Sequence, residues 1–244
     1  MTAEGWLLLG SAPFAGSFLG VLVWRLPADG TLWGRSRCPC CGHALAAWEL
    51  VPLLSYAFQR ARCRHCAGAI DPFHPLIEAA ALAVAAWAVL LGPGEALLAD
   101  CLLGWTLLAL AWIDWETMLL PDALTLPLVL AGLAEGVLGG GTEVPERALG
   151  AALGWAGLAG LAWLWRRLRG IDALGGGDAK LLAAGGAWLG WTLLPSVLLI
   201  AALAGIASAL VQSRGRGTGL RPLAFGPWLA LAIWIARLHL GDAP

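Results

Sequence analysis

Charged residues are scarce in this sequence: they make up 13% of its 244 residues, whereas hydrophobic residues make up 59%. A soluble domain carries about 25% charged residues, so this deficit, with a mean hydropathy of +0.77, argues against a soluble protein. Apolar runs recur along the chain, and each is long enough as a helix to cross most of a ~30 Å hydrocarbon core. The composition therefore predicts an integral membrane protein.

Two further absences narrow the function. The formal net charge is −1 and no run of basic or acidic residues occurs, so we predict no nucleic-acid partner. The first apolar run starts at Gly5 without a basic segment before it, and it ends at Trp24 without a small-residue cleavage site. It is therefore interpreted as a retained first span and not as a removed signal peptide.

The hydrophobic pattern predicts an all-α polytopic membrane protein with about eight transmembrane helices. Only Pro195 and a few neighbours separate the sixth predicted span from the seventh. Pairs of glycines with three residues between them predict close helix packing: Gly16/Gly20, Gly132/Gly136, Gly150/Gly154 and Gly186/Gly190. The predicted spans are residues 5–24, 73–91, 97–113, 119–138, 148–165, 179–194, 196–211 and 223–240.

The basic residues predict the orientation of these spans. Because successive spans cross the membrane in opposite directions, the loops after spans one, five and seven lie on one face. All basic residues except Arg147 and Arg237 lie in or next to these three loops. Loops rich in Lys and Arg stay in the cytoplasm, so this face is predicted to be cytoplasmic and both termini to be outside. Asp100 and Glu135 then lie toward the outer side, where we expect them to be interfacial or packed against polar partners.

One sizeable loop, from about residue 25 to 72, contains two CxxC pairs, Cys38/Cys41 and Cys63/Cys66, at a spacing slightly longer than in usual zinc ribbons. In a cytoplasmic loop the thiols stay reduced. Four thiolates form a closed tetrahedral Zn²⁺ site, which is structural because it has no open position. The sequence thus predicts a small zinc-binding loop domain between the first two spans.

Other residues of this loop leave alternatives open. The competing interpretation is a redox-active or merely reduced cysteine cluster, and Cys40 is a spare thiol that could perturb the choice of ligands. His43 and His65 are interpreted as surface or outer-shell groups and not as ligands. Cys101, in the middle of a span, is interpreted as a small core residue.

Two acids, Asp114 and Asp178, are predicted at one depth near the cytoplasmic face. Asp178 follows three glycines, which allow positive φ and close backbone approach, and it is expected at the start of the next helix. A simpler interpretation of this stretch is a glycine turn followed by an N-cap Asp. Two adjacent carboxylates cannot both ionise easily, so the pair holds one proton. One can then deprotonate water while the other polarises a scissile carbonyl, as in aspartic proteases.

Other functions fit these residues less well than a protease. No Ser-His-Asp or Cys-His arrangement is evident, and a metal site on the two acids would lack further ligands. An ion- or proton-coupled transporter could use Asp114, Asp178 and Glu78 along a path, although transporters place such acids near the midplane. A non-catalytic, zinc-anchored scaffold would leave the membrane acids unexplained.

The order of motifs resembles that of the prepilin peptidases, or type IV leader peptidases, which are polytopic aspartic proteases of the bacterial inner membrane. The resemblance covers nearly the whole chain. It departs from the family pattern at Gly20, Cys40 and Phe73-His74. The matching segments are Gly16-Ser17-Phe18-Leu19 to Arg25-Leu26-Pro27, residues 38–41, 52–56, 62–66 and 75–78, Asp114 with residues 119–125, the GxGDxK block at residues 175–181, and Phe225-Gly226-Pro227.

The resemblance implies that the protein cleaves the leader peptide of type IV prepilins or type II pseudopilins after a Gly. Cleavage would take place at the cytoplasmic face of the membrane, with the protein surrounded by membrane lipid. The resemblance further implies N-methylation of the new terminus with S-adenosylmethionine. It divides the chain into a first helix (1–24), a cytoplasmic four-cysteine zinc-binding domain (25–72) and a transmembrane peptidase domain (73–244).

Asp114 and Asp178 are carried over as the catalytic pair, and Gly175 and Gly177 as the residues whose backbone makes room for it. Asp122 is the alternative to Asp114 as the first catalytic aspartate. It is ranked second because it follows Pro121 and is expected to cap its helix. Lys180 could balance charge or extend its amino group to the membrane interface. The residues that would bind S-adenosylmethionine and the oligomeric state are not predicted.

Overall fold

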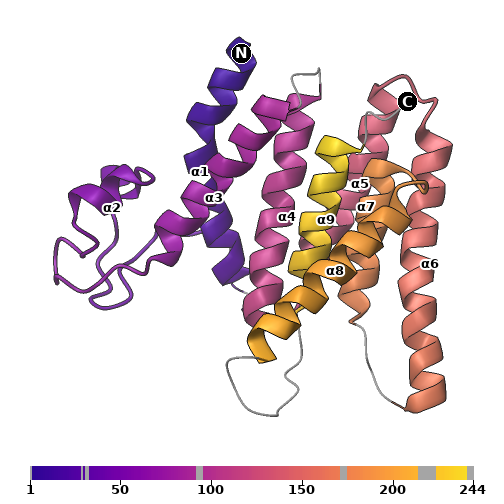
Figure 1. Cartoon of the computed structure of the whole chain (residues 1–244). Coiled ribbons are helices and arrows are strands. Elements are labelled where there is room, and N and C mark those ends of the chain that lie inside the picture. Colours follow the sequence, from indigo (N-terminus) through magenta and orange to yellow (C-terminus); the bar gives the residue numbers. More distant parts are fainter. Residues whose placement is uncertain are drawn as a thin grey trace. The chain divides into compact units, whose positions relative to one another are not determined.

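A computed structural model describes residues 2–28, 30, 33–91, 96–170, 175–213 and 224–240 (Figure 1). These described residues are predominantly helical, and their only β-pairing consists of two isolated bridges. This confirms the predicted all-α class. The helices are α1 (Ala3–Arg25), the 3₁₀ turn η1 (Ala47–Leu50), α2 (Leu54–Phe58), α3 (Phe73–Leu91), α4 (Leu97–Thr117), α5 (Asp122–Leu138), α6 (Val144–Arg169), α7 (Gly176–Leu189), α8 (Leu194–Ser213) and α9 (Gly226–His239).

Every predicted span overlaps one of these helices, although the bounds differ by several residues. Five of them, α1, α3, α4, α6 and α8, are long and apolar enough by themselves to cross a membrane, so the chain is a multi-pass membrane protein. The other three, α5, α7 and α9, have 17, 14 and 14 residues. At about 1.5 Å per residue, helices of this length are shorter than a ~30 Å hydrocarbon core.

The boundary between the sixth and seventh spans was predicted wrongly. The helix ends at Leu189 and not at residue 194, because Gly190 takes φ +77° and breaks the helical geometry. Pro195 lies within the first turn of α8, where its missing N–H would have had no helical partner. Glycine at the helix end, and not the proline, therefore separates the two helices.

The chain forms two compact units, residues 1–109 and 110–244, with the boundary inside α4. In the first unit α1 packs along α3 (Figure 1). A Cβ on Gly16 would lie 2.6 Å from the Cα of Glu78, so only glycine permits this approach. The indole Nε1 of Trp105, in α4, donates to the Ala81 carbonyl of α3 at 3.0 Å. The loop with η1 and α2 extends to one side of the α1–α3 pair.

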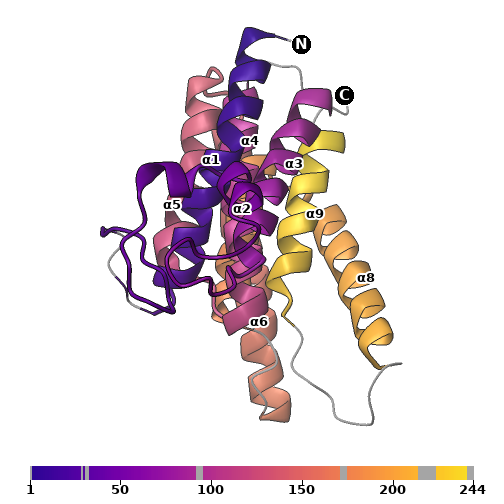
Figure 2. The same cartoon turned by 90° about the vertical axis from the view of Figure 1, so that its left-hand side faces the viewer.

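In the second unit α7 is the central helix, and α5, α6 and α9 all pack against it. It is buried from Asp178 to Trp188 except at Lys180, because alanine, glycine and leucine occupy all its sides. Close contact again requires glycine: a Cβ on Gly150 would lie 2.6 Å from the Gly186 carbonyl oxygen. α8 lies beside α9 in both views (Figures 1 and 2).

A cluster of charges, of which Arg147 is buried and the others partly so, lies within the second unit. Glu135 forms ion pairs with Arg147 and with Arg237, the latter at 3.2 Å, and Arg147 also donates to the Gly132 carbonyl at 2.9 Å. The expectation that Glu135 packs against polar partners is confirmed. Arg147 and Arg237 are the two basic residues that fall outside the predicted cytoplasmic loops, and their pairing offsets the cost of burying charge.

Candidate active site and metal centre

Asp114 lies near the end of α4, and its side chain is held by the start of α9. It is buried, with 6% of its surface exposed, and its Oδ2 accepts a hydrogen bond from the Gly226 N–H at 2.9 Å. Gly226 is the first residue of α9, so the carboxylate lies at a helix N-terminus, where backbone N–H groups and the helix dipole favour negative charge. No feature of the sequence around Asp114 indicated this distant partner.

Asp178 lies in the first turn of α7, as expected, and is 9% exposed. The Gly175 N–H donates to its carboxylate, and the charge of Asp114 acts repulsively on it. Each of the two acids is therefore placed at the N-terminus of a helix within one compact unit. The structure thus brings together two acids that lie far apart in the sequence.

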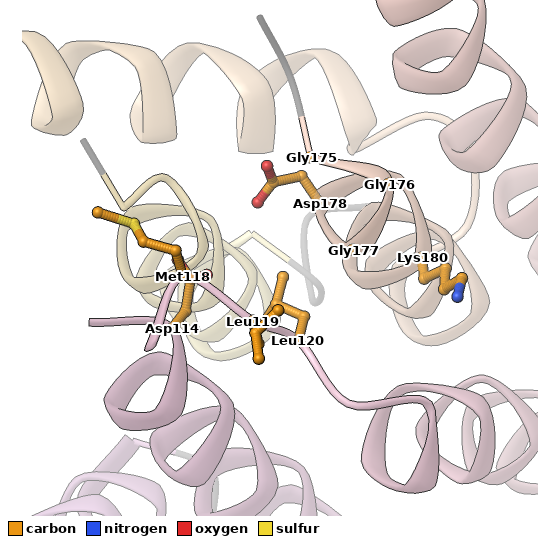
Figure 3. Close-up of a pocket in the computed structure, with 9 residues that line it drawn as sticks. All are labelled: Asp114, Met118, Leu119, Leu120, Gly175, Gly176, Gly177, Asp178 and Lys180. Atoms are coloured by element: carbon orange, nitrogen blue, oxygen red, sulfur yellow. The ribbon is translucent and has the colours of Figure 1, made fainter. Parts of the chain in front are cut away.

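Both carboxylates line one pocket of about 350 Å³ (Figure 3). Figure 3 shows the Asp178 carboxylate directed away from its own helix, toward the side where Asp114 and Met118 lie. Met118, the residue after α4, has φ +57°, a left-handed conformation that turns the chain along the pocket. The remaining lining residues are Leu119, Leu120, Gly175, Gly176, Gly177 and Lys180.

The three glycines before Asp178 allow close approach without positive φ. None of Gly175, Gly176 and Gly177 has positive φ, and Gly175 has φ −70°. Close approach does require Gly177, because a Cβ there would lie 2.8 Å from the Leu120 Cβ. The glycine segment therefore serves packing between α7 and the chain after α4.

Asp122 and Lys180 form an ion pair between α5 and α7. The Lys180 Nζ lies 2.5 Å from the Asp122 Oδ1, and both side chains are partly exposed. The expectation that Asp122 caps its helix is wrong: Pro121 holds that position, and the Asp122 side chain turns to Lys180 instead. Lys180 points away from the Asp178 carboxylate (Figure 3), and Asp122 does not line the pocket.

The four predicted zinc ligands lie together in the loop of the first unit. The Sγ atoms of Cys38, Cys41, Cys63 and Cys66 lie within 4.8 Å of one another, and no disulfide is formed. The cluster can therefore bind a metal ion, and four thiols are the donor set of a structural Zn²⁺ site. Cys40, the spare thiol, is exposed and outside the cluster.

Each CxxC pair forms a tight backbone knuckle. The Cys38 N–H donates to the His43 carbonyl at 2.9 Å, and the Cys63 N–H donates to the Gly68 carbonyl at 2.8 Å. Backbone N–H groups of Cys41 and Cys40 lower the pKa of the Cys38 thiol to about 7. A thiol with this pKa is readily deprotonated, and the thiolate is the form that binds metal.

Glu78, which only the transporter alternative used, has a structural role. It is buried in α3, and its Oε2 accepts from the Leu53 N–H at 2.7 Å, with a further hydrogen bond to Ser17. Leu53 has φ +61°, an unfavourable conformation for leucine. The carboxylate thus holds a strained turn of the loop against α3.

Comparison with known proteins identifies the family. Residues 10–91 match the model of the bacterial Peptidase A24 N-terminal domain, and residues 101–210 match that of the type IV leader peptidase family. The comparison with solved structures found no significant match.

Several relatives of this chain carry the name prepilin leader peptidase/N-methyltransferase. The protein of Burkholderia pseudomallei (strain 1026b) is 48% identical over 243 residues, which cover 88% of this chain and 79% of the relative. That of Aeromonas hydrophila is 46% identical, covering 86% of this chain and 72% of the relative. That of Dickeya chrysanthemi is 39% identical, covering 93% of this chain and 88% of the relative.

Fold and site together define a multi-pass membrane protein with two buried carboxylates in one pocket and a separate four-cysteine cluster. With the matches above, the chain belongs to the type IV leader peptidase family.

Proposed function

We propose that this protein removes the leader peptide of type IV prepilins or type II pseudopilins and then N-methylates the new amino terminus. The observation that carries the proposal is the pocket that Asp114 and Asp178 share, in a chain of this family. The names of the relatives support both activities. The transporter alternative has no support among them.

In the proposed mechanism Asp114 and Asp178 share one proton. The ionised carboxylate takes a proton from a water, whose oxygen attacks the carbonyl carbon of the scissile bond. The protonated carboxyl donates a hydrogen bond to the carbonyl oxygen, and the departing amine finally receives a proton. Burial of both side chains and the repulsion between them favour this shared-proton state.

The same proposal places the site at the cytoplasmic face of the bacterial inner membrane. The basic residues support this orientation, since all but two of them lie in the three predicted cytoplasmic loops or at the helix ends beside those loops. The leader would enter from the cytoplasm, while the hydrophobic segment of the substrate stays among lipid. We divide the chain functionally into the first helix (1–24), the cytoplasmic domain (25–72) and the peptidase domain (73–244).

The proposed function also involves a metal ion and a methyl donor. Zn²⁺ would be held by Cys38, Cys41, Cys63 and Cys66, and would order a loop too small to have its own core. S-adenosylmethionine would supply the methyl group to the free α-amine that cleavage creates. No residues of this chain are assigned to its binding.

The two activities should separate on a pre-cleaved substrate. Cleavage creates the amine that is methylated, so Asp114→Asn and Asp178→Asn should abolish both activities on full-length prepilin. On pilin with a free amino terminus both variants should still transfer labelled methyl at near wild-type rate, because no proton transfer by the dyad is then needed.

Transfer is measured from labelled S-adenosylmethionine, with cleavage followed by a gel shift. Cleavage by the wild type without any methyl transfer would refute the proposed methyltransferase activity but not the peptidase activity. Failure of the wild type to cleave a co-expressed prepilin would refute the proposed function as a whole.

The contact between Gly226 and Asp114 gives a further prediction. A Cβ at residue 226 would lie 2.6 Å from the Asp114 Oδ2, so Gly226→Ala must displace the carboxylate. We expect cleavage to fall about 100-fold, the effect of misplacing a reacting group by ~1 Å. Alanine favours helix over glycine, so folding should persist.

Gly160→Ala is the matched control, because the added Cβ would meet nothing within 4 Å. Cleavage kinetics in detergent, with thermal unfolding measured on the same samples, compare the two variants. Wild-type cleavage by Gly226→Ala would show that the position of Asp114 at the α9 N-terminus does not matter.

A further inference from the structure

A second group of metal-binding side chains lies in the loop of the first unit, apart from the four cysteines. One ring nitrogen each of His43 and His65 and one carboxylate oxygen of Glu49 lie within 4.8 Å of one another. None of the three belongs to the cysteine cluster, and the activities proposed above do not use them. The group was not predicted from the sequence, where both histidines were interpreted as surface or outer-shell residues.

The buried acid of this group has an unsatisfied oxygen. Glu49 is 6% exposed, and its Oε2 accepts from the Ala46 N–H at 2.8 Å. Its Oε1 is buried and has no hydrogen-bond partner. Leaving a buried carboxylate oxygen unpaired is unfavourable, because the oxygen has lost its water without gaining a hydrogen-bond donor or a cation. A cation bound beside the two imidazoles would remove this deficit.

Local structure brings the three residues close together. Glu49 belongs to η1, the His43 carbonyl accepts the Cys38 N–H of the first cysteine knuckle, and His65 lies within the second knuckle. The guanidinium of Arg64 lies 4.8 Å from the centre of the Trp48 ring. This cation–π contact joins the residues immediately before His65 and Glu49, so it keeps those two close together.

We propose that His43, Glu49 and His65 form a second metal site, which binds a divalent first-row transition ion such as Zn²⁺. Two imidazoles and one carboxylate are an established donor set for zinc, and they leave a fourth position open. Both histidines are exposed, so this position faces solvent. The site is therefore accessible and exchangeable, unlike a closed four-thiolate centre.

Binding requires only a small adjustment of exposed side chains. Ligand atoms of a tetrahedral zinc site lie about 3.4 Å apart, given bonds of about 2.1 Å. The two imidazole rings are stacked, with centroids 3.5 Å apart and a tilt of 33°, so one must rotate for both to coordinate one ion. Burial fixes Glu49, whereas the histidines are free to turn at the surface. A neighbouring zinc–tetrathiolate centre, with a formal charge of about −2, would attract the cation.

Cobalt titration of the full-length, metal-free protein in detergent separates the two sites. Co²⁺ bound to thiolates has sulfur-to-metal charge-transfer absorption, and Co²⁺ bound to nitrogen and oxygen lacks it. The wild type should bind one equivalent with this absorption and a second, more weakly, without it. Glu49→Gln should weaken the second equivalent at least 10-fold and leave the first unchanged, because glutamine retains the acceptor for the Ala46 N–H but not the charge.

His65→Phe should have the same effect, since phenylalanine preserves the ring contact with His43 but offers no ligand. Glu4→Gln, an exposed acid on α1, is the control and should bind two equivalents. The thiolate absorption of the first equivalent reports in each sample that the loop is folded. A wild type that binds one equivalent only, or a second equivalent that survives both variants, would overturn the proposal.

Discussion

Replacing either Asp114 or Asp178 by asparagine should lower prepilin cleavage by about 10²–10⁴-fold, the usual contribution of a general acid or base. Asparagine keeps the size of the side chain and can still accept the Gly226 or Gly175 N–H bond. It can neither take a proton from water nor share one with its neighbour. The loss should therefore be chemical, with the fold retained.

Asp122→Asn is the matched control for this experiment. It removes an acid of the same type in the same unit, but its partner is Lys180 and it does not line the pocket. An exposed ion pair contributes at most about 1 kcal/mol, so this variant should keep most of its activity. The activity of all three variants is measured as cleavage of a co-expressed prepilin, followed by gel shift. Full processing by either Asp114→Asn or Asp178→Asn would exclude the shared-proton mechanism.

Removing a cysteine ligand should release the structural metal. After a wash with a weak chelator that strips exchangeable ions, the wild type should retain about one Zn²⁺ per chain, and Cys38→Ser or Cys63→Ser close to none. Structural zinc contributes on the order of 10–16 kcal/mol in small peptides, more than a loop of this size gains by burying side chains. We therefore expect the loop to become sensitive to limited proteolysis between residues 33 and 72.

Cys40→Ser is the control for the metal experiment, because the Cys40 thiol lies in the same knuckle but outside the cluster. It should retain the zinc and the protease resistance of the wild type. Metal analysis and proteolysis of the same purified samples measure both effects. Equal zinc in Cys38→Ser and wild type would exclude the four-cysteine site.

Several features of the fold could be predicted because they depend on local sequence. Each apolar run became a helix, since a segment in lipid must satisfy its own backbone hydrogen bonds. The two CxxC pairs came together as predicted, because such a pair folds into a knuckle by short-range backbone bonds. The placement of Asp178 in the first turn of α7 likewise follows from the residues beside it.

Other features could not be predicted because they depend on which helix faces meet. Lys180 was left with two possible roles until the packing of α5 on α7 gave it Asp122 as a partner. Gly226 belonged to a recognised motif without a stated role, and its contact with Asp114 joins residues of α9 and α4. The group of His43, Glu49 and His65 required the two knuckles and η1 to fold against each other.

By itself, the sequence determined that this chain is a helical membrane protein of a peptidase family with two candidate acids and a four-cysteine cluster. Hydropathy, ligand spacing and motif order carry this information, and all of them are properties along the chain. The tertiary structure decided which charge has which partner: Asp114 with Gly226 and Glu135 with two arginines in the interior, and Asp122 with Lys180 where both are partly exposed. In a buried, low-dielectric interior every charge needs such a partner, and only the packing of distant helices determines which one is within reach.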